Sequence, residues 1–238
     1  MTLTPALFIL PALFAALALA EAWVPARAAA RGRWPVNLAL GAANLLLVRT
    51  LALAGPVAAA AWAAGHRWGV LNQLALPGWA EALLTVILLD LAIYGQHRAL
   101  HRMPWGWALH RLHHADGDFD VTTGVRFHPG EALVSMLYKS ACIVALGAPL
   151  AAVMLFELYL AAGSLCEHAN VRVPPRLDRA LRRVWVTPAM HRIHHSAHGQ
   201  DHNHNYGFAI ALWDHLFATY REVASGPNIG LPQPPRAG

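Results

Sequence analysis

The chain has 238 residues, of which 56% are hydrophobic and only 13% are charged, against roughly 25% charged in an ordinary soluble domain. Together with a mean hydropathy of +0.36, this excludes an ordinary soluble globule, because a domain of this size cannot bury so much apolar surface. The net charge of +5 does not indicate a nucleic-acid partner, since the basic residues flank apolar stretches and no zinc-finger spacing or recognition helix is present.

The first two apolar segments predict helices that enter or cross a membrane. Segment 3–23 would be about 30 Å long as a helix, enough to span. Its residues 18–20 resemble a signal-peptide cleavage site, but no basic residue precedes the apolar run, which favours a retained anchor. Segment 36–65 is interrupted by Arg49 and Pro56, and it predicts either one kinked helix or two shorter ones.

Three further helices are predicted before the polar C-terminal part. Segment 79–101 is long enough to span, and a polar, histidine-rich stretch follows it. Segments 131–149 and 149–168 predict a helical hairpin, broken at the sequence Gly-Ala-Pro that ends at Pro149. The chain from 171 onward is rich in arginine and histidine, which predicts a water-facing, mostly helical cap.

Basic residues predict the orientation of the chain. Fifteen of the eighteen Lys and Arg residues lie in segments 25–35, 97–130 and 171–238. Three spans and a hairpin would place all three segments on one side, which the positive-inside rule makes the cytoplasm. The predicted fold is therefore an all-α membrane helical bundle with a cytoplasmic histidine-rich cap, divided into N-terminal anchor helices (1–78), the main domain (79–220) and a C-terminal tail (221–238).

Fifteen histidines are the unusual number in the composition. Positions i, i+3 and i+4 share one helical face, so an HxxxH or HxxHH cluster can present two or three imidazoles to one point. Neutral imidazole is a ligand for iron, zinc or copper, and eight such ligands suit two ions. The three clusters contain His97 and His101; His110, His113 and His114; and His191, His194 and His195.

Two spans carry polar residues at helical spacing. Asp90 lies on one stripe with His97 and His101, inside an apolar span, where an ionisable residue needs a partner and usually marks function. It predicts either an acceptor that orients a ligand histidine or serves a proton path, or a polar tie to another helix through a residue such as Arg49. His168 lies where the last predicted span leaves the membrane, and it is the predicted ninth ligand.

The order of these motifs resembles the fatty acid hydroxylase and sterol desaturase superfamily of integral membrane di-iron oxygenases. The resemblance covers about residues 80–220. Besides the three histidine clusters, it rests on RFHPGE at 126–131, HAN at 168–170, NYG at 205–207 and WDHLFATY at 213–220.

The resemblance implies a ligand set for two non-haem iron ions. Some eukaryotic members have a further histidine at the position of Ser164, so water or Asn170 would complete one ion here. His128 is either a ligand or a residue of the substrate region, and Asp214 would orient a ligand histidine. The implied ligands are His97, His101, His110, His113, His114, His168, His191, His194 and His195. The histidines expected not to be ligands are His66, His198, His202, His204 and His215.

The resemblance also implies O₂-dependent hydroxylation of a lipid or sterol-like substrate, with desaturation as the alternative that ligand motifs do not exclude. Electrons would come from a separate reductase, of ferredoxin or cytochrome type, because the chain has no dinucleotide motif and its two cysteines, Cys142 and Cys166, supply no iron–sulfur set. The expected location is the bacterial inner membrane. A non-catalytic membrane metal-binding or transport protein, a haem electron carrier and a zinc hydrolase fit the paired clusters less well.

Overall fold

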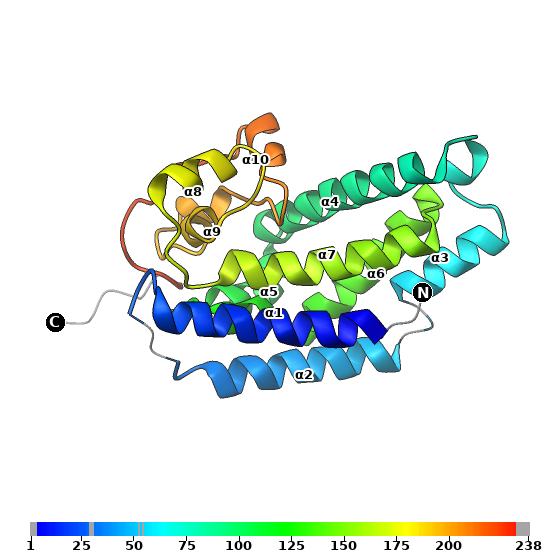
Figure 1. Cartoon of the computed structure of the whole chain (residues 1–238). Coiled ribbons are helices and arrows are strands. Elements are labelled where there is room, and N and C mark those ends of the chain that lie inside the picture. Colours follow the sequence, from blue (N-terminus) through cyan, green and yellow to red (C-terminus); the bar gives the residue numbers. More distant parts are fainter. Residues whose placement is uncertain (1–3, 29–30, 52, 54, 232–238) are drawn as a thin grey trace.

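The computed structural model describes residues 4–28, 31–51, 53 and 55–231. Within these residues the chain is all helical, with three isolated β-bridges and no strand. Residues 1–3, of which residue 3 begins the first predicted span, and residues 232–238 of the predicted tail lie outside this range. The predicted fold class, an all-α helical bundle, is confirmed (Figure 1).

The N-terminal part forms three helices. They are α1 (Thr4–Trp23), α2 (Trp34–Thr50) and α3 (Pro56–Gly65). Segment 36–65 is thus two shorter helices, because Pro56 begins α3 at a position where its missing N–H costs no helical bond. Arg49 lies in the last turn of α2, where its charge complements the helix dipole.

Three later helices are long and apolar enough to cross a membrane, and they give the chain the character of an integral membrane protein. They are α4 (Gly78–Arg102), α6 (Pro129–Leu146) and α7 (Leu150–His168). The predicted hairpin break is confirmed: Gly147 caps α6 in the left-handed region (φ 68°), which glycine adopts without the strain of a side chain. Pro149 then starts the return helix α7.

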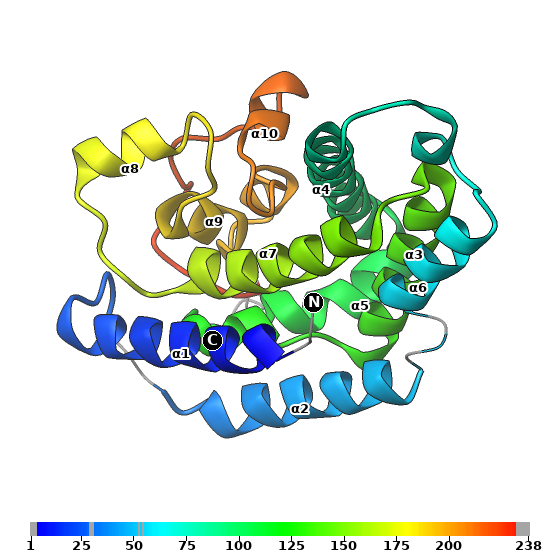
Figure 2. The same cartoon turned by 45° about the vertical axis from the view of Figure 1, so that its right-hand side comes forward.

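The long helices pack around a core of aliphatic and aromatic side chains. Leu89 and Ile93 of α4 meet Ile143 of α6 and Phe156 of α7, all of them buried. Ala60 of α3 joins the same cluster. Because α3 packs on α6 and α7, it closes the bundle at the end away from the histidines, as Figure 2 shows.

The short helices gather at the other end of the bundle (Figures 1 and 2). They are α5 (Pro104–His114), α8 (Pro175–Leu181), α9 (Pro188–His194) and α10 (Leu212–Leu216). The three basic segments meet here. Pro25 forms a β-bridge with Val171, and Asn37, at the start of α2, donates to Asp116 at 2.7 Å.

Candidate metal centre

Nine histidines converge where α4, α5, α7 and α9 meet. Five have ligand atoms within 4.8 Å of one another and form what we call the first group; four others do the same and form the second group. The first group contains His97, His101, His110, His114 and His194, and the second contains His113, His168, His191 and His195. The structure thus brings together all nine predicted ligands, drawn from four helices. Each HxxHH cluster is divided between the groups: its first and last histidines share one group, and its middle histidine belongs to the other.

The first group presents lone pairs toward a shared point. His97 Nε2 lies 3.1 Å from His110 Nε2 and 3.0 Å from His194 Nε2. In each ring Nδ1 faces an oxygen that only accepts, so Nδ1 carries the proton and a neutral ring has a bare lone pair at Nε2. The acceptors, at 2.7–2.9 Å, are the carbonyl oxygens of Tyr206 and His204 and the carboxylate of Glu131.

The second group repeats this arrangement. His168 Nε2 lies 3.1 Å from the Nε2 atoms of both His113 and His191. His168 Nδ1 donates to the Ser164 carbonyl and His113 Nδ1 to the Arg126 carbonyl, so these two Nε2 atoms also bear lone pairs. Facing lone pairs repel unless a cation lies between them. Imidazole nitrogens that face one another at 3.1 Å in this way fit a metal ion held between them.

Buried nitrogens without partners point to the same conclusion. Both ring nitrogens of His114 and of His195, together with His101 Nε2, are buried and have no hydrogen-bond partner in the described residues. Such atoms are costly unless something ligates them. The donor set therefore fits two metal ions, with five imidazoles in one group and four in the other.

Burial keeps the imidazoles neutral, as metal ligands must be. Desolvation, reinforced by neighbouring histidines, holds the pKa of five histidines outside the spans well below the usual range. At neutral pH these rings offer lone pairs rather than charge. The five are His113, His114, His191, His194 and His195.

Two carboxylates at the site were not singled out as site residues in the sequence analysis. Glu131 accepts from His110 Nδ1 at 2.7 Å and so orients that ring and raises its basicity. Glu167 is fully buried, and its two oxygens lie 3.7 Å from the Nδ1 atoms of His168 and His191. The signals were present: Glu131 ends the RFHPGE motif, and Glu167 directly precedes His168.

Four further residues that were predicted to belong to the site contact groups other than the ligand rings, and Asp90 and His128 are the first two. Asp90 accepts from Trp213 Nε1 at 2.7 Å and from Tyr159 at 2.9 Å, so it is a polar tie between elements, with these two partners in place of Arg49. His128 caps α6 by accepting from the Gly130 amide, and it is in neither histidine group.

Asn170 and Asp214 also act on the backbone rather than on a histidine ring. Asn170 is bonded on both sides to the backbone of Arg27. Asp214 accepts from the amides of Tyr206 and Gly207 at 2.8 and 2.7 Å. Since the Tyr206 carbonyl holds His97, Asp214 supports a ligand histidine through one intervening residue instead of by direct contact.

The five histidines expected not to be ligands lie outside both groups. His202 comes nearest, with its ring centroid 5.1 Å from that of His114. His204 supplies the carbonyl that holds His194. The others are His66, His198 and His215.

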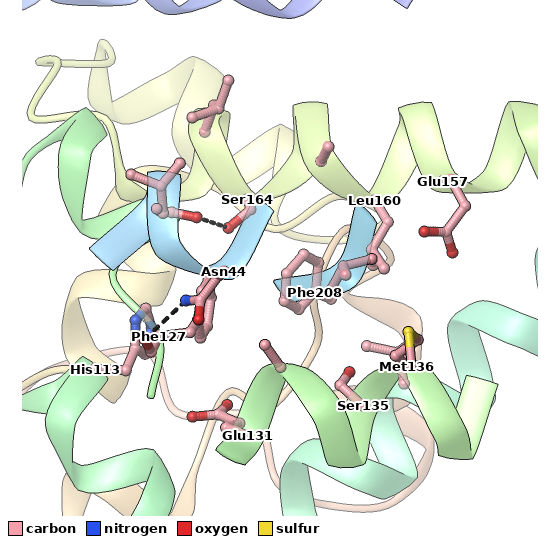
Figure 3. Close-up of a pocket in the computed structure, with 18 of the residues that line it drawn as sticks. Asn44, His113, Phe127, Glu131, Ser135, Met136, Glu157, Leu160, Ser164 and Phe208 are labelled. Carbon is pink, nitrogen blue, oxygen red and sulfur yellow. Dashed lines mark hydrogen bonds between the residues drawn. The ribbon is translucent and has the colours of Figure 1, made fainter. Parts of the chain in front are cut away.

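A cavity of about 550 Å³ opens beside both histidine groups and runs between the membrane helices. His97, His110, His113 and His191 line its inner end, and its walls are mostly apolar. Figure 3 shows Met136, Leu160 and Phe208 along it, with Glu157 farther from His113 than Glu131. The cavity thus offers a mostly apolar space that ends at the histidines.

Comparison with known proteins supplies a family match. The family model described as Fatty acid hydroxylase matches residues 82–219. An ornithine lipid hydroxylase of Rhizobium tropici is 31% identical over 155 residues, which make up 63% of this chain and 45% of that protein. The alkylglycerol monooxygenase of Homo sapiens is 27% identical over 157 residues, 66% of this chain and 33% of that protein.

A beta-carotene hydroxylase of Paracoccus sp. is 30% identical over 139 residues, which make up 53% of this chain and 80% of that protein. The chain thus spans less than half the length of the ornithine lipid hydroxylase and the alkylglycerol monooxygenase. No solved structure matches the chain. The matched region, 82–219, contains every histidine of both groups.

Proposed function

The chain belongs to the fatty acid hydroxylase family, and from this premise we propose that it is a membrane-bound di-iron oxidoreductase that hydroxylates a lipid with O₂. The observation that carries the proposal is the pair of buried histidine groups with facing lone pairs at the end of an apolar cavity. Relatives named as hydroxylases and a monooxygenase support hydroxylation over desaturation.

The nine histidines would hold two iron ions, which supply the redox chemistry with O₂ that no amino-acid side chain can perform. The protein's part is to fix the rings. Backbone carbonyls and Glu131 accept the Nδ1 protons of five of the rings, so the Nε2 lone pairs of these five stay aimed inward. In the second group, Ser164 donates to the Gly124 carbonyl and the Asn170 side chain is bonded to the backbone of Arg27, so water or the remaining lone pair of the Asn170 oxygen would complete the coordination.

Substrate access would come through the apolar cavity. Its walls include Leu10 and Phe14 of α1 and Leu45 of α2, so an acyl or polyene chain could lie between the helices with one carbon beside the histidines. Holding that carbon in place supplies orientation, and apolar walls exclude water from the reaction. These apolar walls contact the lipid's hydrocarbon chain, so they do not by themselves determine which polar headgroup the substrate carries.

Electrons would reach the site from a separate ferredoxin or cytochrome-type donor. The three basic segments that meet at the histidine end of the bundle support a cytoplasmic position for the site by the positive-inside rule. The proposed location is the bacterial inner membrane. A reporter fused after the last residue, active only in the cytoplasm, tests this orientation.

The test of the proposed function is metal analysis combined with an oxidation assay. Full-length protein made under iron-replete conditions should contain two irons per chain with the Mössbauer signature of a non-haem pair. In a host supplied with a compatible reductase, lipids should gain one oxygen that is labelled by ¹⁸O₂. Stoichiometric zinc and no O₂-dependent product would refute the proposal.

His194→Ala sharpens this test, because His194 Nε2 faces His97 in the first group. The variant should lose the oxygenated product and about one iron per chain. His66→Ala is the matched control, since His66 is exposed and far from both groups in the chain. Full turnover by His194→Ala would remove His194 from the ligand set.

A further inference from the structure

A second, smaller pocket of about 220 Å³ lies on the other side of α9 from the apolar cavity's histidines. It is formed by Arg27, which follows α1, by Ala189 and Arg192 of α9, and by the loop around Gly226. Its volume exceeds the roughly 30 Å³ of one water molecule several-fold, so it can hold a polyatomic group.

Two guanidinium groups present unpaired donors there. Arg192 has both Nε and Nη2 buried without a hydrogen-bond partner, and Arg27 has Nη1 in the same state. Nε and Nη2 form the edge of the guanidinium that binds two oxygens of one carboxylate or phosphate. An unpaired buried charge is costly, and two of the same sign lining one pocket are more so.

Within the residues that the structure describes, no carboxylate accepts a hydrogen bond from these donors. None of the residues that line the pocket in the described part of the chain is acidic. Asp178 on α8 interacts electrostatically with Arg192, but no hydrogen bond joins the two in the described residues, and the Asp178 oxygens bind Thr187 at 2.6 Å and Arg182 at 2.7 Å. The positive charge of the pocket is therefore left for a ligand to neutralise.

Contacts with neighbouring residues hold the two arginines of the pocket in position. The Asn170 side chain bonds the N–H and the carbonyl of Arg27 at 3.1 and 3.0 Å, which fixes the segment after α1. The Arg192 guanidinium lies 5.5 Å from the centre of the Phe119 ring, a distance at which a cation is attracted to the ring face. Both arginines are thus held in place without an acidic partner.

The exposure of Trp23, which precedes Arg27 in the chain, bears on where the pocket would lie relative to a membrane. Trp23, at the end of α1, is 84% exposed, and exposed tryptophan at the end of an apolar helix marks the headgroup region. Arg27 follows it by four residues. We propose that Arg27 and Arg192 form a binding site for one phosphate group, carried by a phospholipid or free in solution. This site goes beyond the proposed oxidation and does not depend on it.

The experiment is thermal unfolding of delipidated full-length protein in a neutral detergent. Three probes are titrated at constant ionic strength: inorganic phosphate, dihexanoylphosphatidylglycerol, and dihexanoylglycerol, which lacks the phosphate. A ligand that binds only the folded state raises the unfolding midpoint in a saturable way. The phosphate-bearing probe should do so and dihexanoylglycerol should not. Stabilisation by the phospholipid alone identifies a lipid headgroup, and stabilisation by inorganic phosphate as well identifies a site open to the free ion.

Arg27→Gln is the deciding variant, because Arg192 stands between metal-binding histidines and its replacement can disturb them. Loss of one charge-assisted hydrogen bond should raise the half-saturating concentration roughly tenfold or more. Arg176→Gln, at an exposed position on α8, should bind as the wild type does. Arg192→Lys keeps the charge but loses the two-oxygen edge, and should bind more weakly as well. No saturable effect in the wild type, or an unchanged one in Arg27→Gln, overturns the proposal.

Discussion

Glu131 illustrates how one carboxylate can orient the ring of a candidate metal ligand. It accepts the Nδ1 proton of His110 at 2.7 Å, and its other oxygen has no hydrogen-bond partner in the described residues. Glu131→Gln should weaken iron binding by about 10- to 100-fold, as the loss of such a partner does at other metal sites. Competition with a chelator measures this affinity.

Glu222→Gln is the matched control, since Glu222 is an exposed residue of the C-terminal loop. Its iron affinity should equal that of the wild type. Equal affinities in both variants would contradict the positioning role of Glu131. The histidines alone would then determine iron affinity.

At this scale, the sequence predicted the histidines better than the groups that orient them. An HxxHH spacing specifies which rings share a helical face, and the resulting set is brought together in the structure. It does not specify where Nδ1 points, because the partners of His97 and His194 are the backbone carbonyls of Tyr206 and His204. Every residue has a backbone carbonyl, so a histidine partner of this kind cannot be recognised from the residue types in the sequence. For the same reason, the sequence predicts a bond from a ligand histidine to Asp214, whereas Asp214 accepts from the backbone amides of Tyr206 and Gly207.

Among the elements, the α6–α7 hairpin depends on a backbone conformation at Gly147. A Cβ there would lie 2.6 Å from the Trp68 carbonyl oxygen and 2.5 Å from Asn72 Nδ2, and φ is already +68°. Gly147→Ala should lower stability by about 1–2 kcal/mol from the conformation alone, and by more from the contacts. Gly95→Ala in α4 has no neighbour within 4 Å of the added carbon, and should unfold at or above the wild-type midpoint.

The hairpin also carries an ion pair that spans its two helices beside the apolar cavity. Lys139 Nζ lies 2.7 and 2.9 Å from the two oxygens of Glu157. Lys139→Met should lower the unfolding midpoint because it leaves a lone carboxylate among apolar side chains. The double variant Lys139→Met with Glu157→Leu should recover most of that loss. A double variant less stable than either single one would show that the pair itself stabilises the bundle.

Helix positions followed closely from the sequence, since a span must be long and apolar wherever it faces lipid. The end of α2 did not, because the interruption of residues 36–65 by Arg49 and Pro56 fits a single kinked helix as well as two shorter helices. Tertiary packing determines whether these residues form one kinked helix or two separate helices. α3 packs on α6 and α7 through residues such as Ala60, and hydropathy does not record such contacts.

For the whole molecule, the metal site and the stability of the bundle are linked through protons. Five histidines outside the spans have a folded-state pKa well below the ordinary 6.5, because burial disfavours the charged ring. The unfolded chain therefore binds more protons than the folded chain below about pH 6.5. Stability then rises with pH in this range and falls as the solution is acidified. Above about pH 7.5 both states are neutral at these rings, and the dependence should vanish.

Metal-free protein should thus show an unfolding midpoint that is flat between pH 7.5 and 8.5 and drops steadily from about pH 6.5 to 5. Iron-loaded protein should hold its midpoint to lower pH, because bound metal competes with protons for the same lone pairs, until the metal is released. Replacing exposed His66 by Ala should leave both curves unchanged. A midpoint for the metal-free protein that rises on acidification would mean that the buried rings are charged in the folded state, which is incompatible with two groups of nitrogens facing one another at 3.0–3.1 Å.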